Sequence, residues 1–366
     1  MRKGKVAVAM SGGVDSSVAA YLLKAEGYDV VGVTMKLWND DQPDTLRHSR
    51  SCCTIEDVED ARRVCQIIGA PHYVMNFQQE FQAHVIDYFV SEYQLGRTPH
   101  PCLACNDKIK FDFLMNKAHA LDIDYVATGH YARLDSSNGH SRLLKGIDSL
   151  KDQSYVLFNL RPHQVRHLLL PVGMYTKVEI RDIAREAGLP VADKPDSQEI
   201  CFIPTNDYRA FIAERFASMP GEIADTDGNV LGQHQGIEQF TVGQRRGLGI
   251  FSKEPMFVLS LDRESNRVVV GPVEELLQST LWASGVNYLS GVSPECPVEV
   301  EAKIRYKSSL AWATLIPHDD WVAVRFQEPQ RAITPGQAVV FYQGDEVLGG
   351  GFIEGAVKHP LPARTP

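Results

Sequence analysis

The chain has 366 residues, of which 44% are hydrophobic and 23% are charged. At roughly 150 residues per domain this length predicts two or three folded domains, and the ordinary composition excludes disordered and fibrous proteins. The formal net charge of −9 excludes an overall positive field that would bind nucleic acid indiscriminately. Selective binding through local basic patches stays open.

The N-terminus and the cysteines indicate the compartment. No apolar run reaches the length of about 18 residues that a membrane span needs, and the apolar run Val6–Met10 is too short for a secretory signal. We therefore expect a cytoplasmic protein with no membrane partner. Seven cysteines, an odd number with close pairs at Cys52–Cys53 and Cys102–Cys105, are not typical of a secreted disulfide framework. Reactive or metal-binding thiols are the better interpretation.

The N-terminal half alternates predicted strands and helices. Lys5–Met10 predicts a strand, Ser17–Glu26 a helix, and Asp29–Met35 the next strand. The alternation continues with a helix, a strand, two helices and a strand at Ile55–Gly69, His72–Asn76, Phe77–Tyr93, Lys108–Leu121 and Tyr125–Thr128. This order predicts an α/β domain with a parallel sheet covered by helices on both faces, where ligands bind beyond the carboxyl ends of the strands.

After about Phe216 the helical pattern gives way to short runs separated by turns, such as Asp227-Gly228-Asn229 and Gln343-Gly344-Asp345. In Val298–Lys307 apolar and charged residues alternate, which predicts a half-buried strand. We expect an N-terminal catalytic α/β domain at residues 1–207, a small central β-rich domain at 208–275 and a C-terminal β-barrel-like domain at 276–366. A plain supporting role for the β half is the alternative.

A loop rich in glycine and serine, Ser11-Gly12-Gly13-Val14-Asp15-Ser16-Ser17, follows the first predicted strand and opens the first helix. Glycines let backbone amides approach a ligand, and a helix N-terminus attracts anions, so the loop suits a pyrophosphate. The lysine of a Walker motif is missing, which disfavours transfer of the γ-phosphoryl group, and the dinucleotide motif GxGxxG is missing too. A turn capped by serine, with no ligand, is the alternative.

The string SGGVDSS resembles the PP-loop of ATP pyrophosphatases, enzymes that split ATP between its α- and β-phosphates and adenylate a carbonyl oxygen. The resemblance implies adenylation chemistry. It leaves the substrate open, because amidating synthetases and RNA sulfurtransferases share the loop.

A second dense motif, Gly96–Lys108, contains Cys102 and Cys105. Its prolines predict an extended approach to a helix that Asn106 or Asp107 caps. Cys105 is therefore expected at a helix N-terminus, where the helix dipole and Lys108 lower its pKa from the reference of about 8.5. A buried structural cysteine is the alternative.

Further motifs run through the rest of the chain. Asp196–Pro204 contains Cys201, and other strings are TPHPCLACNDKIKF from Thr98, ATGHYAR from Ala127, KDQSYVL from Lys151, GQRRGLGI from Gly243 and TPGQAVVFY from Thr334. Together these motifs resemble the tRNA-specific 2-thiouridylases along nearly the whole chain. The resemblance implies ATP-dependent sulfur transfer to the wobble uridine of tRNA, with release of AMP and pyrophosphate. ATP chemistry brings Mg²⁺ with it as a second expected cofactor.

In the scheme that the resemblance implies, Cys201 carries the sulfur as a persulfide and Cys105 is the second catalytic thiol. Adenylation turns the uridine C2 oxygen into a good leaving group, which a sulfur nucleophile then displaces. Attack of Cys105 on the persulfide releases the sulfur and leaves a transient Cys105–Cys201 disulfide, which suits a reducing compartment.

The chain departs from the commoner family pattern at Cys102, where many members have an aspartate proposed as an acid or base. Cys102 is therefore a third candidate for a catalytic role, and its role in proton transfer is open. Cys102, Cys105 and Cys201 are also possible ligands of an iron–sulfur cluster with one iron open to sulfide. A zinc site is disfavoured because no second CxxC motif supplies further ligands.

The resemblance also assigns binding positions. ATP contacts align with Ala9, Met10, Ser11, Gly12, Gly13, Val14, Asp15, Ser16, Met35 and Gly129. The segment that meets the target base aligns with His100, Pro101 and Cys102. Other tRNA contacts align with His130, Lys151, Asp152, Gln153, Arg305, Tyr306 and Gln337. Taken without the resemblance, His130, Arg305 and Tyr306 are equally typical of ordinary strand residues.

The remaining features are less specific. Arg245 and Arg246 form a basic loop that suits a phosphate or is a plain tight turn, and Cys52 and Cys53 receive no role. Cys65 and Cys296 are expected to be packing residues. The expected partners are tRNA and a sulfur-donor protein or sulfide, and the protein is expected to be monomeric.

Two rival functions differ from the main hypothesis. The first is a PP-loop synthetase that amidates a small acid, which needs no paired thiols. The second is a non-catalytic protein that binds nucleotides and RNA through its β domains.

Overall fold

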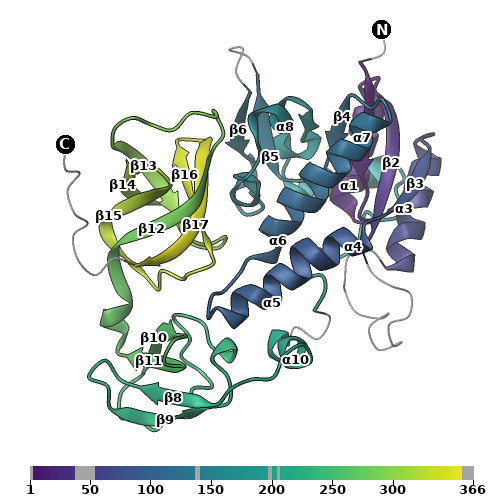
Figure 1. Cartoon of the computed structure of the whole chain (residues 1–366). Helices are drawn as coiled ribbons and strands as arrows, with labels where there is room; N and C mark the ends of the chain where they lie inside the picture. The colour runs from purple at the N-terminus through teal and green to yellow at the C-terminus, as the bar shows by residue number, and fades with distance from the viewer. Residues whose placement is uncertain (1–2, 38–53, 137–140, 197–199, 204–206, 357–366) are drawn as a thin grey trace.

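The computed structural model describes residues 3–37, 54–136, 141–196, 200–203 and 207–356. Three sheets organise these residues: a parallel sheet with helices, a small four-stranded sheet and a β-barrel (Figure 1). The predicted fold class, α/β followed by a β-rich part and a barrel, is confirmed. None of the helices in the described residues is long and apolar enough to cross a membrane.

The N-terminal sheet has the strand order β3-β2-β1-β4-β7, and every neighbouring pair is parallel. Its strands are β1 (Lys5–Ala9), β2 (Asp29–Lys36), β3 (His72–Asn76), β4 (Tyr125–Ala127) and β7 (Leu168–Leu169). The first helices of this part are α1 (Val14–Ala25), α3 (Ile55–Ile67), α4 (Gln78–Phe81), α5 (Asp87–Gln94), α6 (Pro101–Ala104) and α7 (Met115–Ala120). The later ones are α8 (Pro162–Arg166), α9 (Lys177–Glu186) and α10 (Tyr208–Ala213). Stretches with π-type helical geometry, Gln82–Ile86 and Cys105–Leu114, join α4 to α5 and α6 to α7.

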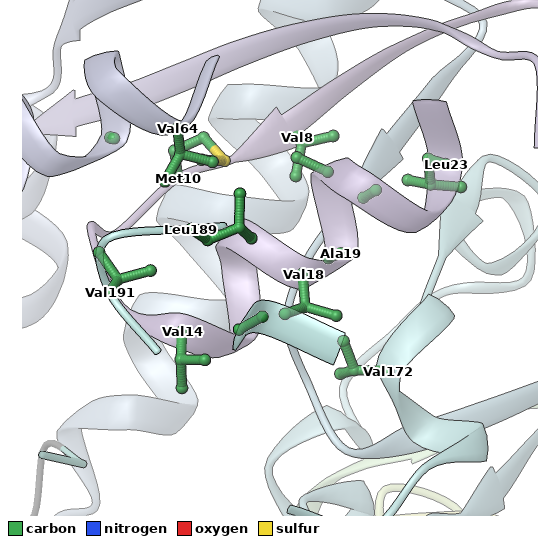
Figure 2. Close-up of a cluster of buried hydrophobic side chains, with 14 of the residues drawn as sticks. Val8, Met10, Val14, Val18, Ala19, Leu23, Val64, Val172, Leu189 and Val191 are labelled. Carbon is green, nitrogen blue, oxygen red and sulfur yellow. The ribbon is translucent and has the colours of Figure 1, made fainter. Parts of the chain in front are cut away.

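Apolar cores cover both faces of the parallel sheet. In β1 and the residue that follows it, Val6, Val8 and Met10 point into one core. Ala7 and Ala9 point into the core on the other face of the sheet. This alternation follows from the two-residue period of a strand. Figure 2 shows the first core, where side chains of α1 such as Val18 and Leu23 pack near Val8. The carboxyl end of β1 is thereby fixed from both sides.

The central sheet has the order β10-β11-β8-β9, in which β8 and β11 are parallel and the other pairs antiparallel. Its strands are β8 (Gly221–Ala224), β9 (Val230–His234), β10 (Phe257–Asp262) and β11 (Arg267–Gly271). The predicted turn at residues 227–229 joins β8 to β9.

Six antiparallel strands form the C-terminal barrel, which the β12–β17 pairing closes. They are β12 (Leu277–Tyr288), β13 (Val298–Lys303), β14 (Ala311–Pro317), β15 (Trp321–Arg331), β16 (Ala338–Gln343) and β17 (Glu346–Ala356). A hairpin of the N-terminal half, β5 (Ala132–Asp135) and β6 (Arg142–Lys145), reaches the barrel through a pairing of Leu144 with Glu346 (Figure 1). The alternation predicted from Val298 onward is present, but the strand ends at Lys303.

Two helices begin earlier than the sequence predicted. The first helix starts at Val14, directly after the glycines, so that Ser16 and Ser17 lie in its first turn. The helix predicted from Lys108 starts at Pro101, with His100 as its N-cap residue. Proline suits the first position of a helix because its missing amide proton would be unpaired there anyway. The expected cap at Asn106 or Asp107 is therefore wrong, and Cys105 lies one turn inside the helix.

Candidate active site

The loop between β1 and α1 has the geometry of an anion-binding site. Gly12 has φ of +71°, and a Cβ there would lie 2.3 Å from the backbone oxygen of Asp57, so only glycine fits. Ser16 Oγ accepts a hydrogen bond from the Ser11 amide at 3.2 Å, and Ser17 Oγ donates to Gly13 O at 2.8 Å. These bonds hold the loop against the start of α1, whose N-terminus no side chain of the described residues caps. Helix amides left in this state attract phosphate oxygens.

Gly129 lies against this loop, as its place in the predicted ATP site requires. A Cβ at Gly129 would lie 2.7 Å from both Asp15 C and Ser16 N. Several other predicted ATP contacts have side chains in the cores: Ala9, Met10, Val14 and Met35 are each at most 8% exposed. These residues can therefore contribute mainly backbone atoms or a small side-chain edge to a ligand.

Asp15 anchors an ion-pair network that the sequence did not reveal. Lys177 Nζ lies 2.7 and 2.8 Å from the two Asp15 carboxylate oxygens and 2.9 Å from Asp196 Oδ1. Tyr131 donates its hydroxyl to Asp15 Oδ1 at 2.6 Å, and burial followed by the charge of Asp15 raises the Tyr131 pKa. Lys177 is held at the start of α9 and is largely buried. It is the cation nearest the loop in this network.

Asp196 extends the network toward Cys201. Its carboxylate accepts hydrogen bonds from Lys151 at 2.7 Å and from Arg181 at 3.0 Å, besides the contact with Lys177. Burial would raise the Asp196 pKa, but the bonds and charges of Lys151 and Lys177 lower it to about 2. The start of the segment that carries Cys201 is thus tied to the loop of α1. The string DSQEICF at residues 196–202 marks Asp196 as a candidate residue. Only the fold shows that Lys151, Lys177 and Arg181 are the cations that contact it.

A second lysine, Lys194, clamps the other side of the loop. Its Nζ donates to Gly12 O at 3.1 Å and lies 2.7 Å from carboxylate oxygens of both Asp57 and Asp60. Burial lowers the Lys194 pKa, but the hydrogen bonds that Lys194 donates to these two carboxylates raise it above its ordinary value. Lysines from residues 177 and 194 thereby hold both edges of the loop.

The three candidate thiols lie around the helix that starts at Pro101. Cys102 occupies the second helical position and is exposed, whereas Cys105 and Cys201 are half-buried and pack against the same core under the sheet. Lys108, expected to favour a thiolate, instead pairs with Asp107 at 3.1 Å and Asp112 at 3.3 Å. Among the described residues no group of three or more Cys, His, Asp or Glu side chains is placed to hold a metal ion. Cys105 and Cys201 therefore pack against one core while Cys102 is exposed, and the three thiols are not placed together as ligands of one cluster.

An aromatic group lies at the start of the same helix. The His100 ring is 6.1 Å from the Tyr155 ring and 6.3 Å from the Tyr306 ring. Burial lowers the His100 pKa to about 4, so the ring is neutral at physiological pH. Its Nδ1 atom is buried and has no hydrogen-bond partner among the described residues. Such an atom can bind a polar edge of a ligand.

Comparisons with known proteins place this geometry in a family. Three family models match: a tRNA methyl transferase HUP domain at residues 4–205, a tRNA methyl transferase PRC-barrel domain at 209–272 and an aminomethyltransferase β-barrel domain at 278–353. The chain is 50% identical to the tRNA-specific 2-thiouridylase MnmA of Clostridium perfringens over 97% of this chain and 99% of that protein. It is 52% identical to that of Heliobacterium modesticaldum over 98% of this chain and 95% of that protein. The chain belongs to the tRNA-specific 2-thiouridylase family.

Solved structures give a weaker match. A 4-thiouridine synthetase in complex with RNA and ATP is 17% identical, with a TM-score of 0.38 over 58% of this chain and 50% of that chain. The relatives along the full chain therefore carry the family assignment.

The segment before the thiol helix joins all three parts of the 2-thiouridylase fold. The Thr98 amide donates to Pro335 O at 2.9 Å, and Gln337 Nε2 donates to Thr98 O at 2.8 Å. Thr98 Oγ1 also donates to Thr241 Oγ1 at 3.2 Å. Arg97 pairs with Glu354 of β17. The barrel and the central sheet thus set where the helix of Cys102 and Cys105 begins.

Several positions that the family resemblance assigned to tRNA form hydrogen bonds within the protein. His130 is 7% exposed, burial holds its pKa well below the usual value, and its Nδ1 is 2.7 Å from Thr128 Oγ1. Asp152 accepts a hydrogen bond from the Gly146 amide at 2.9 Å, and Gln153 Oε1 accepts from the Tyr131 amide at 2.9 Å. In this conformation these side chains fix the loop beside the PP-loop. Pro101 is buried as the first helical residue.

The two described cysteines outside the motifs, Cys65 and Cys296, differ in burial. Cys65 is fully buried, and burial raises its pKa to about 11, so the predicted packing role is confirmed. The same prediction for Cys296 is wrong, because its side chain is exposed. Cys52 and Cys53 lie outside the described residues.

Proposed function

We propose that the protein catalyses ATP-dependent 2-thiolation of the wobble uridine in tRNA. The observation that carries the proposal is the connection from the PP-loop to the thiols. Asp15, Lys177 and Asp196 form a continuous chain of ion pairs, and Asp196 opens the segment of Cys201, which packs against the same core as Cys105. Membership of the 2-thiouridylase family supplies the substrate and the reaction.

The first step is adenylation of the base. The uridine C2 oxygen attacks the α-phosphorus of ATP, and pyrophosphate leaves. The PP-loop amides and Lys177 are placed to stabilise the charge that develops on the departing phosphates. Mg²⁺ held by the phosphates of bound ATP would add to this charge neutralisation.

The second step transfers sulfur. A donor protein passes the outer sulfur of its own persulfide to Cys201 and is left as a free thiol, and the Cys105 thiolate then attacks the inner sulfur of the Cys201 persulfide. The bond between the two persulfide sulfurs breaks, hydrosulfide leaves and a Cys105–Cys201 disulfide forms. Hydrosulfide adds to C2 and AMP departs with the former C2 oxygen. A thiol reductant then returns the disulfide to two thiols before the next cycle.

Recognition of the base rests on the group around His100. Bases in RNA loops are splayed out and stacked on aromatic side chains, and their edges are read by hydrogen bonds. Tyr155 and Tyr306 lie beside His100, whose buried Nδ1 is unpaired within the described residues. We assign His100 to the polar edge of the target uridine.

A cluster mechanism through Cys102, Cys105 and Cys201 fits the arrangement less well, because Cys102 is exposed while the other two thiols pack against the core. We therefore derive no step through iron. Anaerobic purification that yields stoichiometric iron and acid-labile sulfide, lost together with activity in the variants C102A, C105A and C201A, would replace the persulfide scheme.

The deciding experiment incubates unmodified tRNA with the protein, ATP, magnesium and a persulfide-bearing sulfur donor without oxygen, followed by nucleoside mass spectrometry. We expect 2-thiouridine from the parent protein and from the control C296A, and none from C105A. Formation of AMP with a small acid, without any thiouridine, would favour the amidating synthetase. Tight tRNA binding without release of pyrophosphate would favour the non-catalytic protein.

A further inference from the structure

Two cavities meet at Arg331, the last residue of β15. One, of about 510 Å³, lies between the central sheet and the barrel and is lined by Arg245 and Phe257 among others. The second, of about 540 Å³, lies on the barrel between the ends of β13 and β15 and includes Arg305 and Trp312. Arg331 lines both cavities, so its side chain lies at the boundary between them.

The two arginines of the barrel cavity are fixed in place by groups without charge. Arg305 donates to Ala332 O and, at 2.9 Å, to Thr334 Oγ1. The Arg331 guanidinium carbon lies 5.1 Å from the centre of the Phe257 ring, in a cation–π contact. In the part of the chain that the structure describes, neither guanidinium forms an ion pair. Two positioned guanidinium groups without a counter-ion are a preformed site for an anion.

The two cations also repel each other in the empty protein. Burial, followed by the positive charge of Arg331, lowers the Arg305 pKa. Glu328 is the carboxylate that lines the barrel cavity beside them, and Glu254 and Glu274 line the other cavity beside Arg245. The barrel cavity therefore has two cations against one carboxylate, whereas charges in the other cavity balance. An anion is expected in the barrel cavity.

The other groups of the barrel cavity suit a nucleotide rather than a bare ion. Trp312 is 57% exposed and offers an aromatic face, on which any base can stack. Ser308, Gln327 and Gln330 supply hydroxyl and amide groups for ribose and base edges. Cations, an exposed aromatic ring and neutral polar groups in one hollow are the components of a single-stranded RNA subsite.

The cavity is connected to the candidate base site through consecutive residues. Arg305 lines the cavity, while the next residue, Tyr306, has its ring 6.3 Å from that of His100. A nucleotide bound at Arg305 therefore lies close to a base held at His100. Gly243 of the central sheet packs here as well, since a Cβ on it would be 2.8 Å from Ala332 Cβ.

From these contacts we infer that the groove formed by Arg305, Arg331 and Trp312 binds a nucleotide of the single-stranded tRNA loop next to the target uridine. The two guanidinium groups hold its phosphate, and Trp312 stacks on its base. The inference rests on the proposed function and adds Arg331 and Trp312 to the substrate contacts. Arg331 acts on the affinity for RNA and leaves the chemistry at the thiols unchanged.

The test measures binding of unmodified tRNA between 50 and 200 mM salt for the variants R331A and R331K, with R325A as the matched control. Arg325 lies on the same strand and is exposed, but it lines neither cavity. Loss of one phosphate contact should reduce the slope of log affinity against log salt by about 0.7 to 0.9. We expect R331A to show this reduction and a KM for tRNA raised about tenfold at unchanged kcat. R331K should retain the slope, because its charge remains.

A second variant tests the base contact. W312A should weaken tRNA binding by about fivefold to a hundredfold, since stacking contributes about 1–3 kcal/mol per base. The control W282A removes another partly exposed tryptophan of the barrel and should bind tRNA as the parent protein does.

The outcomes separate this inference from the proposed function. If the parent protein thiolates tRNA while R331A and W312A behave like their controls, the inference is wrong and the function stands. If R331A weakens binding of uridine monophosphate but leaves the salt slope for tRNA unchanged, the groove takes free nucleotides and the inference is again wrong. The binding slope is read without turnover, so a reduced slope supports the RNA subsite even where thiolation fails.

Discussion

Lys177 Nζ contacts both carboxylate oxygens of Asp15, at 2.7 and 2.8 Å, although 162 residues separate the two in the chain. Asp15 lies in the first turn of α1, at the PP-loop, and Lys177 opens α9. We therefore expect this largely buried ammonium group to compensate the carboxylates in the empty site and the phosphates of bound ATP in the occupied one.

Replacement of Lys177 by methionine should therefore impair the ATP half-reaction. We expect pyrophosphate release to fall tenfold to a hundredfold, which corresponds to about 1–3 kcal/mol. K177R should retain most of the activity because it keeps the charge. The control K3A removes a lysine whose pair with Glu26 is half-exposed on both sides, and should leave pyrophosphate release unchanged. Equal rates for K177M and K3A would contradict a role at the phosphates.

Gly129 should tolerate no side chain. A Cβ there would approach the backbone of Asp15 and Ser16 to 2.7 Å, so G129A must displace the start of α1. Overpacking of this kind costs about 1–3 kcal/mol, and the displaced amides should weaken ATP binding by at least about tenfold. Equilibrium dialysis with ATP and thermal unfolding measure the two effects. G355A is the matched control, because its Cβ would meet only Trp282 Nε1 at an ordinary 3.5 Å.

Local sequence patterns predicted the loop and its scaffold, but not its partners. Strand period, glycines and the following helix lie within residues 5–26, so the PP-loop could be found without knowing the fold. Lys177 meets Asp15 and Asp196 only because α9 packs against α1. Gln337 binds Thr98 across 239 residues of chain, and no periodicity encodes such a contact.

The thiol helix shows a different limit. The sequence pattern predicts an extended segment at Pro99 and Pro101. Pro101 fits the first position of a helix equally well, and the structure has it there. Because proline is compatible with both conformations, the predicted helix starts after Cys105. The prediction therefore placed Cys105 at the positive end of the helix dipole, which was wrong. Cys102, rather than Cys105, lies in the first turn.

The buried imidazole of His100 should make stability depend on pH. Its pKa falls from an ordinary 6.5 to about 4 in the folded protein, so the unfolded chain binds the extra proton between these values and stability falls as the pH drops through this window. At pH 5 the loss from this residue is about 2 kcal/mol relative to pH 7.5. Urea unfolding measures the free energy of unfolding at both pH values. The drop in this free energy from pH 7.5 to pH 5 should be smaller in H100Q than in the parent protein by about 2 kcal/mol. An identical difference in the parent and H100Q would show that His100 is not the titrating group.

Substitution of Cys102 separates the two sulfur-transfer schemes. Because Cys102 is exposed and the persulfide scheme needs only Cys105 and Cys201, C102A should retain thiolation within about tenfold of the parent rate. A role of Cys102 as general acid or base would instead cost about 10²–10⁴-fold. C102D, which has the residue of the commoner family pattern, should be at least as active as C102A. Nucleoside mass spectrometry gives the rates. Complete loss of thiouridine in C102A, together with loss of bound iron, would instead support the cluster.

The shared environment of Cys105 and Cys201 predicts a disulfide as the product of one turnover. Both side chains pack against the same core. The persulfide scheme requires that their sulfur atoms come within disulfide distance during turnover. With Cys201 charged as a persulfide and no reductant present, the protein should form at most one thiouridine per chain and then stop. Peptide mapping under non-reducing conditions should show the Cys105–Cys201 link, and dithiothreitol should restore turnover. C105A should keep its persulfide and form no link, whereas the control C296A should behave as the parent. Continued turnover without reductant would contradict transfer through a Cys201 persulfide, because both release of hydrosulfide and direct attack of the persulfide on C2 leave an S–S bond that a thiol must reduce.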